Sequence, residues 1–582
     1  MSLLASLARA YERLLDAPEF GYSDQKIGFC VVLHPDGSVA EVADLRDHDK
    51  KRSPRVLRVP ASPKRAGTTP RPNFMWDNIN YALGAGKLTD PCDTRHDSFR
   101  DKHLEYFNRS VSDDIRTFCA FLRYWCPDQV RTYFDAENLP TEGIVFACSP
   151  TYREQFLHEN TAVRGLWSKE RERWISVEGK KTVDAACIVT GQRSPIERTH
   201  PPIKGILGPK VAESALVTFN SNAYESYGHR QGDNAPVSES AAFAYTTALN
   251  QFLADQNHRL QIGDATTVFW ADASDRERAL EAEALFSGMF DSLSDDRVAA
   301  ARVKGKLDAI RIGTRLAQID PQLDAGVRFF VLGLAPNVSR LSVRFFWESD
   351  FGSLTANYQR FLRDMEMDPP SRDAWPPIWR YLIELAAQRE RNNIPPRVAG
   401  EWMRAVLAGT PYPLMLLSTV LMRIRSDGYV NGLRSAILKS VLIRNFKREV
   451  PVALDSENTN KGYVLGRLFA VYEEIQRAAL GGNVNATIKD KFYGAASASP
   501  QKVFRTLDAG SQNHFSKLRK QNPGRAVNLE KTIGSIMDLM NPGDEPIPVA
   551  LNATEQALFG IGYYHQHSDF FRKHDNKSEV NK

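Results

Sequence analysis

The hydrophobic pattern of this chain changes its period near residue 350. Before that point short β-rich runs alternate with helical stretches, and from about residue 351 only helical patterns follow. A period of two residues is typical of half-buried strands, and a period of 3.6 residues is typical of amphipathic helices. We therefore predict an α+β fold, with a mixed α/β domain at 1–360 and an all-α C-terminal bundle at 361–582.

Several strands and helices can be placed within the first part. The runs at 27–33 and 38–46 flank a His-Pro-Asp-Gly turn and predict a hairpin. Further strands are expected at 143–149, 185–191, 215–220 and 266–272, with two more within 327–347, and helices are expected at 101–124, 238–255 and 276–318.

The second part shows the helical period most clearly at 462–480, "GYVLGRLFAVYEEIQRAAL". Its apolar residues share one face, and we expect Arg467, Glu474 and Arg477 on the opposite, polar face. The residues of the apolar face are Leu465, Leu468, Phe469, Tyr472, Ile475 and Ala479. A similar pattern at 527–540 supports a bundle of several helices.

Positive charge gathers in one proline-rich stretch, residues 50–76, "KKRSPRVLRVPASPKRAGTTPRPNFMW". Eight Lys or Arg, five Pro and no acid occur in these 27 residues. Charge runs of this kind are often solvated linkers. They can also form a loop that binds phosphates, with an aromatic residue to stack on or wedge between bases. Both interpretations stay open at this point.

A second basic zone lies at 502–525, where six Lys or Arg face a single acid, Asp508. Lys489 and Lys491 precede it. On helices these residues would form a basic ridge, although ordinary surface charge is the alternative. The net charge of the chain is only +5, so contact with nucleic acid has to rest on such local patches.

The motifs of common enzymes are missing from the sequence. No GxxxxGK[ST] phosphate loop and no GxSxG elbow occurs. His-Asp pairs at 48–49, 96–97 and 574–575 lack a visible pattern of further ligands, and His565, His567 and Asp569 would spread round a helix. We expect no enzyme activity, no metal and no cofactor. A metal-dependent nuclease using a His-Asp pair, or a scaffold that binds only proteins, are the rival hypotheses.

A loop rich in Gly and Pro follows the run at 185–191. His200, Lys204 and Lys210 could face phosphates there, and Asn220 could contact nucleic acid, although turn formation and bracing of the loop are the commoner roles. Ser238 is expected to cap the helix that follows.

The expected compartment is the cytoplasm. Six cysteines are scattered without CxxC spacing, which is typical of buried thiols in a reducing environment. The N-terminal "MSLLASLARAYERLL" carries charges within its apolar pattern and predicts an amphipathic helix rather than a signal peptide. The longest apolar segment, 413–422, is too short to span a bilayer.

Long segments of the chain resemble the large subunit of subtype I-C CRISPR Cascade surveillance complexes. These segments are "PNFMWDNINYALG" (72–84), "VTGQRSPIERTHPPIKG" (189–205), "TFNSNAYESYGHRQGDNAPVSESAAFAYTTALN" (218–250), "VLGLAPNVSRLSVRFFW" (331–347), "GYVLGRLFAVYEEIQRAALGGNVNATIKDKFYGAASASPQKVFRTL" (462–507) and "FGIGYYHQ" (559–566). They extend from near the N-terminus almost to the C-terminus.

The resemblance implies a non-enzymatic subunit of an RNA-guided antiviral ribonucleoprotein. Such a subunit lies near the 5′ end of the CRISPR RNA, beside the capping subunit and the Cascade backbone. It reads the protospacer-adjacent motif (PAM) in double-stranded DNA, helps to form the R-loop, guides the displaced strand and recruits a helicase-nuclease. The C-terminal bundle resembles the separate small subunit, which internal translation starting around residues 460–465 could supply. An acidic anti-CRISPR inhibitor that mimics DNA would suit the basic surfaces.

On this interpretation two groups of residues are predicted to bind DNA. Asn73 is the expected reader of a base edge, and Phe74 is either a wedge at the split or an anchor of the loop. The predicted duplex contacts are Lys50, Lys51, Arg52, Lys64, Arg65, Arg71, Asn73 and Phe74. The predicted strand contacts are Lys489, Lys491, Lys502, Arg505, Lys517, Arg519 and Lys520.

Overall fold

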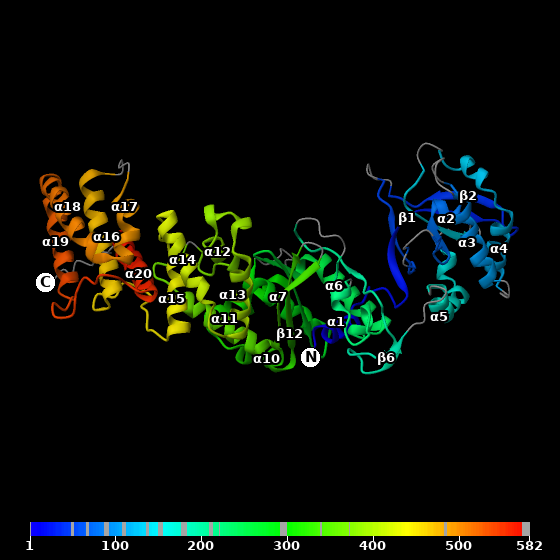
Figure 1. The fold of residues 1–582 in the computed structure, drawn as a ribbon, viewed down its shortest axis with the longest axis horizontal. Helices are drawn as coiled ribbons and strands as arrows, with labels where there is room; N and C mark the ends of the chain where they lie inside the picture. Colours follow the sequence, from blue (N-terminus) through cyan, green and yellow to red (C-terminus); the bar gives the residue numbers. More distant parts are fainter. Residues whose placement is uncertain are drawn as a thin grey trace. The chain divides into compact units, whose positions relative to one another are not determined.

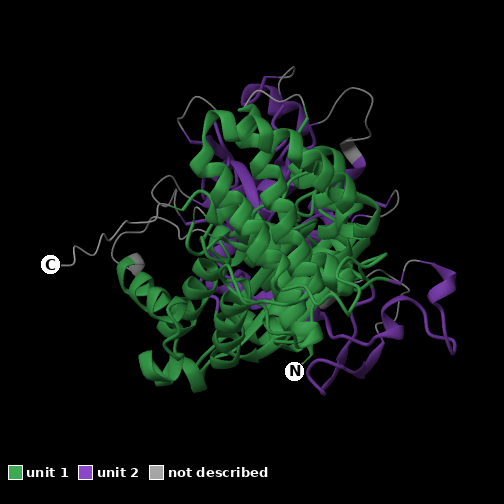
Figure 2. Cartoon of the chain, turned by 90° about the vertical axis from the view of Figure 1, so that its left-hand side faces the viewer, with its two compact units in different colours: residues 1–13, 199–218, 248–582 green, residues 14–198, 219–247 purple. Residues whose placement is uncertain are grey.

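The computed structural model describes residues 2–47, 52–63, 65, 69–85, 92–107, 112–135, 139–148, 155–175, 183–208, 214–219, 221–291, 299–337, 340–371, 373–481 and 486–572. The chain divides into two compact units, shown in two colours in Figure 2. Unit 1 comprises residues 1–13, 199–218 and 248–582, and unit 2 comprises residues 14–198 and 219–247. Each unit is thus assembled from segments that are far apart in the sequence.

The main sheet of unit 2 is built around one long strand, β1 (Tyr22–Leu33). β2 (Val39–Asp44) pairs antiparallel with its second half, and β3 (Arg55–Pro60) pairs antiparallel with its first half. On the other edge β5 (Gly143–Cys148) runs parallel to β1 and pairs with β4 (Trp76–Asn78). The predicted hairpin and the predicted strand at 143–149 are confirmed.

The helices of unit 2 cover this sheet with an aromatic core. They are α2 (Ile79–Ala82), α3 (Cys92–Phe107), α4 (Asp113–Tyr124) and α5 (Thr161–Ile175). The helix predicted at 101–124 is therefore two helices. Buried aromatic residues of this core include Phe74, Phe99, Phe107, Phe118, Phe146, Trp167 and Trp174. A separate hairpin pairs β6 (Asp184–Ala186) with β7 (Arg193–Pro195).

The sheet of unit 1 is an antiparallel meander of β10 (Arg259–Ile262), β11 (Ala265–Asp272), β12 (Arg328–Asn337) and β13 (Arg340–Asp350). It confirms the strands predicted at 266–272 and within 327–347.

Two predicted strands are much shorter than expected. Of the run at 185–191, only the start is a strand, β6. A turn follows it, in which Gly191 takes the left-handed conformation with φ of 74°. The run at 215–220 is limited to β9 (Ser214–Ala215), which pairs with β8 (Pro202–Ile203). Ser221 then caps a short 3-10 turn at Asn222–Tyr224, so the polar side chains favour turn structure over a longer strand.

The remaining helices are drawn from blue to red in Figure 1. They are α1 (Leu3–Tyr11), α6 (Glu239–Ala254), α7 (Arg276–Phe290), α8 (Ala299–Arg311), α9 (Leu316–Ile319), α10 (Pro321–Gly326), α11 (Phe351–Met365), α12 (Ile378–Ile383), α13 (Pro396–Ala408), α14 (Leu414–Asp427), α15 (Gly432–Phe446), α16 (Lys461–Leu480), α17 (Ile488–Ala498), α18 (Pro500–Gln521), α19 (Pro523–Met537) and α20 (Ala553–Asp569). The helices predicted at 238–255 and 276–318 correspond to α6 and to α7, α8 and α9.

The sheet of unit 1 and the helices that follow it share one hydrophobic core. Phe269 and Phe329 from the strands belong to the same buried cluster as Trp402 on α13 and Tyr463 on α16. The last strand ends at Asp350, where the strand pattern of the sequence stops. The expected boundary at residue 360 nevertheless does not separate the two compact units, since residues 248–582 all belong to unit 1. Helices α11 and α13 pack against the sheet that precedes them.

Helix α16 occupies the centre of the C-terminal bundle, and its expected apolar face is buried. The prediction of an opposite polar face is wrong for Arg467 and Glu474, which are 5% and 2% exposed. Arg467 donates to the side chain of Gln566, and Glu474 pairs with Arg477. Neighbouring segments bury both side chains and supply hydrogen-bond or ion-pair partners, which periodicity alone does not reveal.

Three of the described cysteines, Cys30, Cys119 and Cys187, are buried as expected, whereas Cys126 is exposed and Cys148 is partly buried. Within the described residues, no helix combines the length and the apolar character that crossing a bilayer requires.

Candidate nucleic-acid interface

Two loops leave the sheet of unit 2 on either side of β3. The β2–β3 loop (residues 45–54) departs from one sheet edge and rejoins it, since β2 and β3 pair with successive parts of β1. The N–H of Asp47 donates to the carbonyl of Ser53 (2.9 Å) and closes its base. Arg52 is exposed beside this closure. Lys50 and Lys51 lie outside the described residues.

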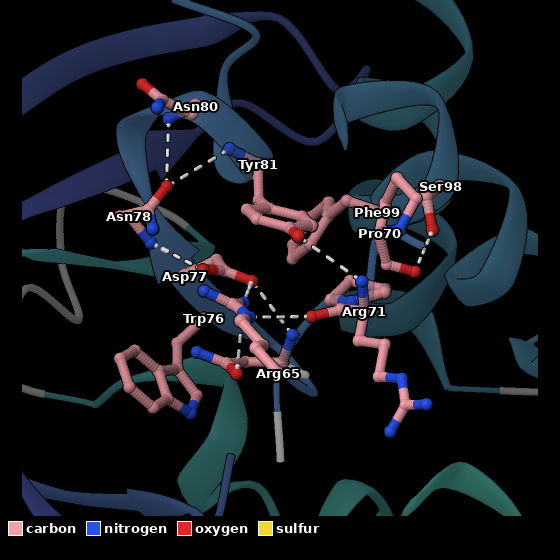
Figure 3. Close-up of polar contacts among 12 residues, drawn as sticks. Arg65, Pro70, Arg71, Trp76, Asp77, Asn78, Asn80, Tyr81, Ser98 and Phe99 are labelled. Atoms are coloured by element: carbon pink, nitrogen blue, oxygen red, sulfur yellow. Dashed lines mark hydrogen bonds and ion pairs between the residues drawn. The ribbon is translucent and has the colours of Figure 1, made fainter. Parts of the chain in front are cut away.

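The β3–β4 loop (residues 61–75) is braced from within by Arg65, as Figure 3 shows. The Arg65 Nε donates to the carbonyl oxygen of Arg71 (2.8 Å), and its Nη2 donates to the Asp77 carboxylate (2.5 Å). The same Nη2 reaches Oδ1 of Asn73 (3.2 Å). The guanidinium carbon also lies 4.1 Å from the ring centroid of Tyr81. This brace directs the guanidinium toward Asp77, while 33% of the Arg65 side chain stays exposed, and the predicted phosphate contact there stays a prediction. Lys64 lies outside the described residues.

Asp77 is the buried partner of this brace, and its side chain is fully enclosed. Its carboxylate also accepts the backbone N–H groups of Asn73 (2.8 Å) and Asn78 (2.8 Å). Burial raises the pKa of Asp77, while the Arg65 guanidinium and the two N–H groups oppose that shift. Asp77 was not among the residues predicted from the sequence. The signal was available, because Asp77 is the first acid after the acid-free stretch at 50–76.

Asn73 and Phe74 are both covered in this conformation. Asn73 is 2% exposed and Phe74 is 1% exposed. The Phe74 ring lies 5.0 Å from the ring centroids of Trp167 and of Trp174. Phe74 therefore occupies the position of a loop anchor, the alternative to a wedge that the sequence left open.

His103 ties the next residue of the loop to α3. Its Nε2 accepts the backbone N–H of Met75 (2.9 Å), and its Nδ1 lies 2.7 Å from the carbonyl oxygen of Phe99. These partners define a neutral imidazole that carries its proton on Nδ1. Complete burial lowers the pKa of His103 to about 3. The loop is therefore attached to the core through a histidine that stays uncharged.

Arg71 differs from Arg65 in its direction. Its backbone N–H donates to the hydroxyl of Tyr81 (3.2 Å), whereas its guanidinium points away from Asp77 in Figure 3. The side chain of Arg71 thus takes no part in the brace and is partly exposed, and the predicted phosphate contact there stays a prediction.

Further cations lie on β3, on β1 and directly after β2. Arg55 and Lys26 are exposed, and neither forms an ion pair with any residue that the structure describes. Arg58 is paired with Asp24 (3.1 Å), and Arg46 is paired with Asp44 (2.7 Å). Arg55 was not singled out from the sequence, although it belongs to the same acid-free stretch. Together with Arg52, it gives this edge two exposed guanidinium groups that form no ion pair with a described residue.

Helix α18 in unit 1 presents a face of cations. At about 100° per residue, Lys502, Arg505, Lys517 and Lys520 fall within an arc of roughly 120° that spans about 27 Å of the axis. All four are exposed, and they lie opposite the buried positions Val503, Phe504, Leu507, Ser511, Phe515 and Leu518. None of the four makes an ion pair with a residue in the described part of the chain. The predicted basic ridge is therefore an acid-free face on this helix.

The other predicted cations of the bundle differ in whether they lie near an acid. Arg519 forms an ion pair with Glu530 on α19, and Lys489 lies 3.9 Å from Glu473. Lys491 is exposed on α17. The helix α18 itself contains one acid, Asp508, which accepts from the hydroxyl of Tyr472 (3.1 Å) and lies outside the cationic arc.

Of the residues predicted to bind nucleic acid in the loop that follows β7, the structure describes two, and one of them is buried. His200 is 7% exposed, whereas Lys204 is exposed and its backbone N–H donates to Asn250 (2.7 Å). Lys210 and Asn220 lie outside the described residues. Ser238 caps α6 as predicted, since its hydroxyl accepts the N–H of Ala241 (3.2 Å).

The His-Asp pair at 96–97 is split between two environments. His96 is 2% exposed and lies with its Nδ1 3.0 Å from the carbonyl of Tyr81, whereas Asp97 pairs with Arg100 (2.8 Å). The other two pairs lie outside the described residues. In the described ranges no three His, Cys, Asp or Glu side chains gather in the way a metal ion needs. His565 hydrogen-bonds with the hydroxyl of Tyr463 (2.9 Å).

Comparison with known protein families gives one match. The model of a family described as CRISPR-associated protein (Cas_Csd1) matches residues 7–571, which is nearly the whole chain. A search of curated proteins finds no match.

Proposed function

Because the chain belongs to the CRISPR-associated Cas_Csd1 family, we propose that it is the large subunit of an RNA-guided DNA surveillance complex of the subtype I-C Cascade kind. In this proposal it recognises the PAM, nucleates unwinding and holds the displaced strand. Cleavage is left to a helicase-nuclease that it recruits, so the chain itself is not an enzyme.

The observation that carries this proposal is the acid-free face of α18. Four exposed cations along about 27 Å of helix form a track for a phosphate backbone rather than a pocket for a small anion. Neutralising phosphates releases counterions and supplies affinity without sequence preference. A displaced strand needs this type of binding, since its sequence differs from one target to the next.

The loops of unit 2 supply the second part of the proposal. Breaking each DNA stacking step costs roughly 1.4 kcal/mol, so opening the first two or three pairs costs several kcal/mol before pairing with the guide returns it. Arg52, Arg55 and Arg71 can offset part of this cost by holding phosphates beside the split. In the conformation described here, base reading by Asn73 requires the Arg65 brace to open, because the Asn73 amide is covered.

The partners follow from the same proposal. The mixed part of the chain would contact the 5′ region of the CRISPR RNA and its capping subunit, and the bundle would act beside small subunits made by internal translation. Binding of a DNA-mimicking inhibitor would compete for the same cations. The cytoplasm is the compartment in which these partners meet.

The salt dependence of single-strand binding tests this proposal. In the full-length chain Lys502, Arg505, Lys517 and Lys520 are replaced together by Gln, and affinity for oligothymidylate is measured at several salt concentrations. Up to four lost phosphate contacts reduce the slope of log K against log salt by as much as about 3. The matched control, Arg302→Gln with Lys304→Gln on α8, leaves the slope unchanged. An unchanged slope in the α18 variant would mean that these four cations do not contact phosphates, and it would contradict the proposal.

A further inference from the structure

Unit 1 contains two adjoining hollows that the proposed function does not use. Each has a volume of about 520 Å³, and both are lined by Arg311, Trp375 and Leu433. Volumes of roughly 300–1,000 Å³ are typical of binding pockets. The first hollow lies among α8, α11, α12 and α15, beneath the segment that joins α11 to α12. It is therefore large enough to receive a group from another molecule.

The floor of the first hollow is apolar. Leu362, Met365, Met367, Leu433 and Ala436 line it, and each is at least nine-tenths buried. The amide of Gln359 also lines it, but its Nε2 is already used by the carbonyls of Ile310 (2.9 Å) and Thr314 (2.7 Å). A nucleobase would bury its polar edges against this floor without partners, at about 1–3 kcal/mol for each unpaired group. The lining suits a hydrocarbon group better.

The rim supplies one aromatic ring and one incompletely paired cation. Trp375 is 38% exposed, which is unusual for a ring of this size. Arg311 uses Nη2 for the carbonyl of Gly288 (2.8 Å), and its Nη1 lies 3.7 Å from Asp308. Its Nε is buried without a hydrogen-bond partner among the described residues. The Arg311 side chain is 19% exposed, so an acceptor on an incoming molecule reaches the outer part of its guanidinium.

The segment that carries Trp375 is held in place from several directions. The N–H of Asp368 donates to the carbonyl of Val452 (2.9 Å), and the carboxylate of Asp368 pairs with Arg572. Asp373 pairs with Arg380 on α12. With these two acids paired, the cations that line the first hollow are Arg311 and the exposed Arg363, and Glu366 is the remaining acid of its lining. The hollow is thus preformed, which lowers the cost of binding.

We propose that this pair of hollows is a docking site for a partner protein, which inserts an aromatic or large aliphatic side chain flanked by a carboxylate. The side chain fills the apolar floor beside Trp375, and the carboxylate accepts from Arg311. Trp and Arg are the residue types that most often dominate binding energy at interfaces. The site is independent of the cationic surfaces, so its failure leaves the proposed function standing.

A fluorescent probe tests the site in the full-length chain. The probe is 1-anilinonaphthalene-8-sulfonate, an apolar aromatic anion, and its fluorescence is measured as it is titrated into the protein. Ala436→Phe fills the floor, and Trp375→Ala removes the exposed ring without disturbing the core. Each is expected to weaken binding at least fivefold, whereas Met422→Ala, on the exposed face of α14, leaves it unchanged. Equal binding by all four proteins overturns the proposal.

Competition then identifies the class of partner. The dipeptide Ac-Phe-Glu-NH₂ is expected to displace the probe at lower concentration than Ac-Phe-Gln-NH₂, and this preference is expected to vanish in Arg311→Gln. Displacement by decathymidylate would assign the site to nucleic acid and overturn the proposal. Failure of both dipeptides to displace the probe, or a preference that persists in Arg311→Gln, also overturns it.

Discussion

The β3–β4 loop of unit 2 and helix α18 of unit 1 are both rich in basic residues, but they use their cations in opposite ways. In the loop, Arg65 turns inward and holds Asp77, Asn73 and the backbone of Arg71. On α18, Lys502, Arg505, Lys517 and Lys520 all face outward, with no acid inside their arc. In the loop a cation thus helps to stabilise the fold, whereas on α18 the cations are exposed and can bind an anionic partner.

This difference shows why a count of charges does not identify a binding residue. A cation next to one buried acid acts on the stability of the fold, because the acid needs a partner in an environment of low dielectric constant. A cation without such an acid acts on association with an anionic partner. Loss of Arg65 is therefore expected to change stability, and loss of a cation on α18 is expected to change binding.

The largest effect is expected from Arg65→Ala. It leaves the Asp77 carboxylate buried without its guanidinium partner, and breaking a buried pair in this way costs about 3 kcal/mol. Urea denaturation followed by circular dichroism measures the loss. Lys517→Ala on α18 is the contrasting variant, and its change stays within about 0.5 kcal/mol.

A double variant sharpens this prediction. Arg65→Ala combined with Asp77→Ala is expected to cost less than the sum of the two single changes, since the charge that was left unpaired is gone. Additive costs would mean that the two side chains act independently, and the brace would then contribute nothing as a pair.

A smaller effect is expected from Asn73→Ala on DNA binding. If Asn73 reads a base edge, its loss weakens binding to duplex that carries the flanking motif by about 1–3 kcal/mol. Binding to a target already melted at that position is far less affected, because no unwinding is left to nucleate. Tyr81→Phe is the control, since it removes the hydroxyl that accepts the Arg71 N–H and perturbs the loop without changing Asn73. Equal losses of affinity on both targets would mean that the loop holds DNA without reading the flanking motif.

The smallest effect is a dependence of stability on pH that arises from His103. Its folded-state pKa of about 3 lies below the ordinary value of 6.5, so below pH 6.5 the unfolded chain binds a proton that the folded chain does not. Stability therefore falls as the pH drops from 6.5 toward 3, by about 1 kcal/mol between pH 7 and pH 5.5. Urea midpoints measured across this range for the native chain and His103→Gln give the difference. Parallel curves would contradict the assignment.

Elements that depend on local pattern were predictable. The hairpin of β1 and β2, the strands β11, β12 and β13, and the helices α6 and α16 all follow from periodicity and turn residues. The strands predicted at 185–191 and 215–220 were not, since turns at Gly191 and Ser221 end them early. The division into units could not be read from the pattern either, because residues 199–218 leave the surrounding sequence to join unit 1.

The sequence by itself determined the α+β class, the end of the strands at residue 350, the two basic stretches and the resemblance to a CRISPR-associated family, because periodicity, composition and motifs are properties of neighbouring residues. Only the tertiary structure decided which cations are available. Whether Arg65 meets Asp77 or water, and whether Glu474 on α16 is surface or core, depends on residues that the fold brings together. Burial sets the energy of a charge, and burial is a property of the folded chain.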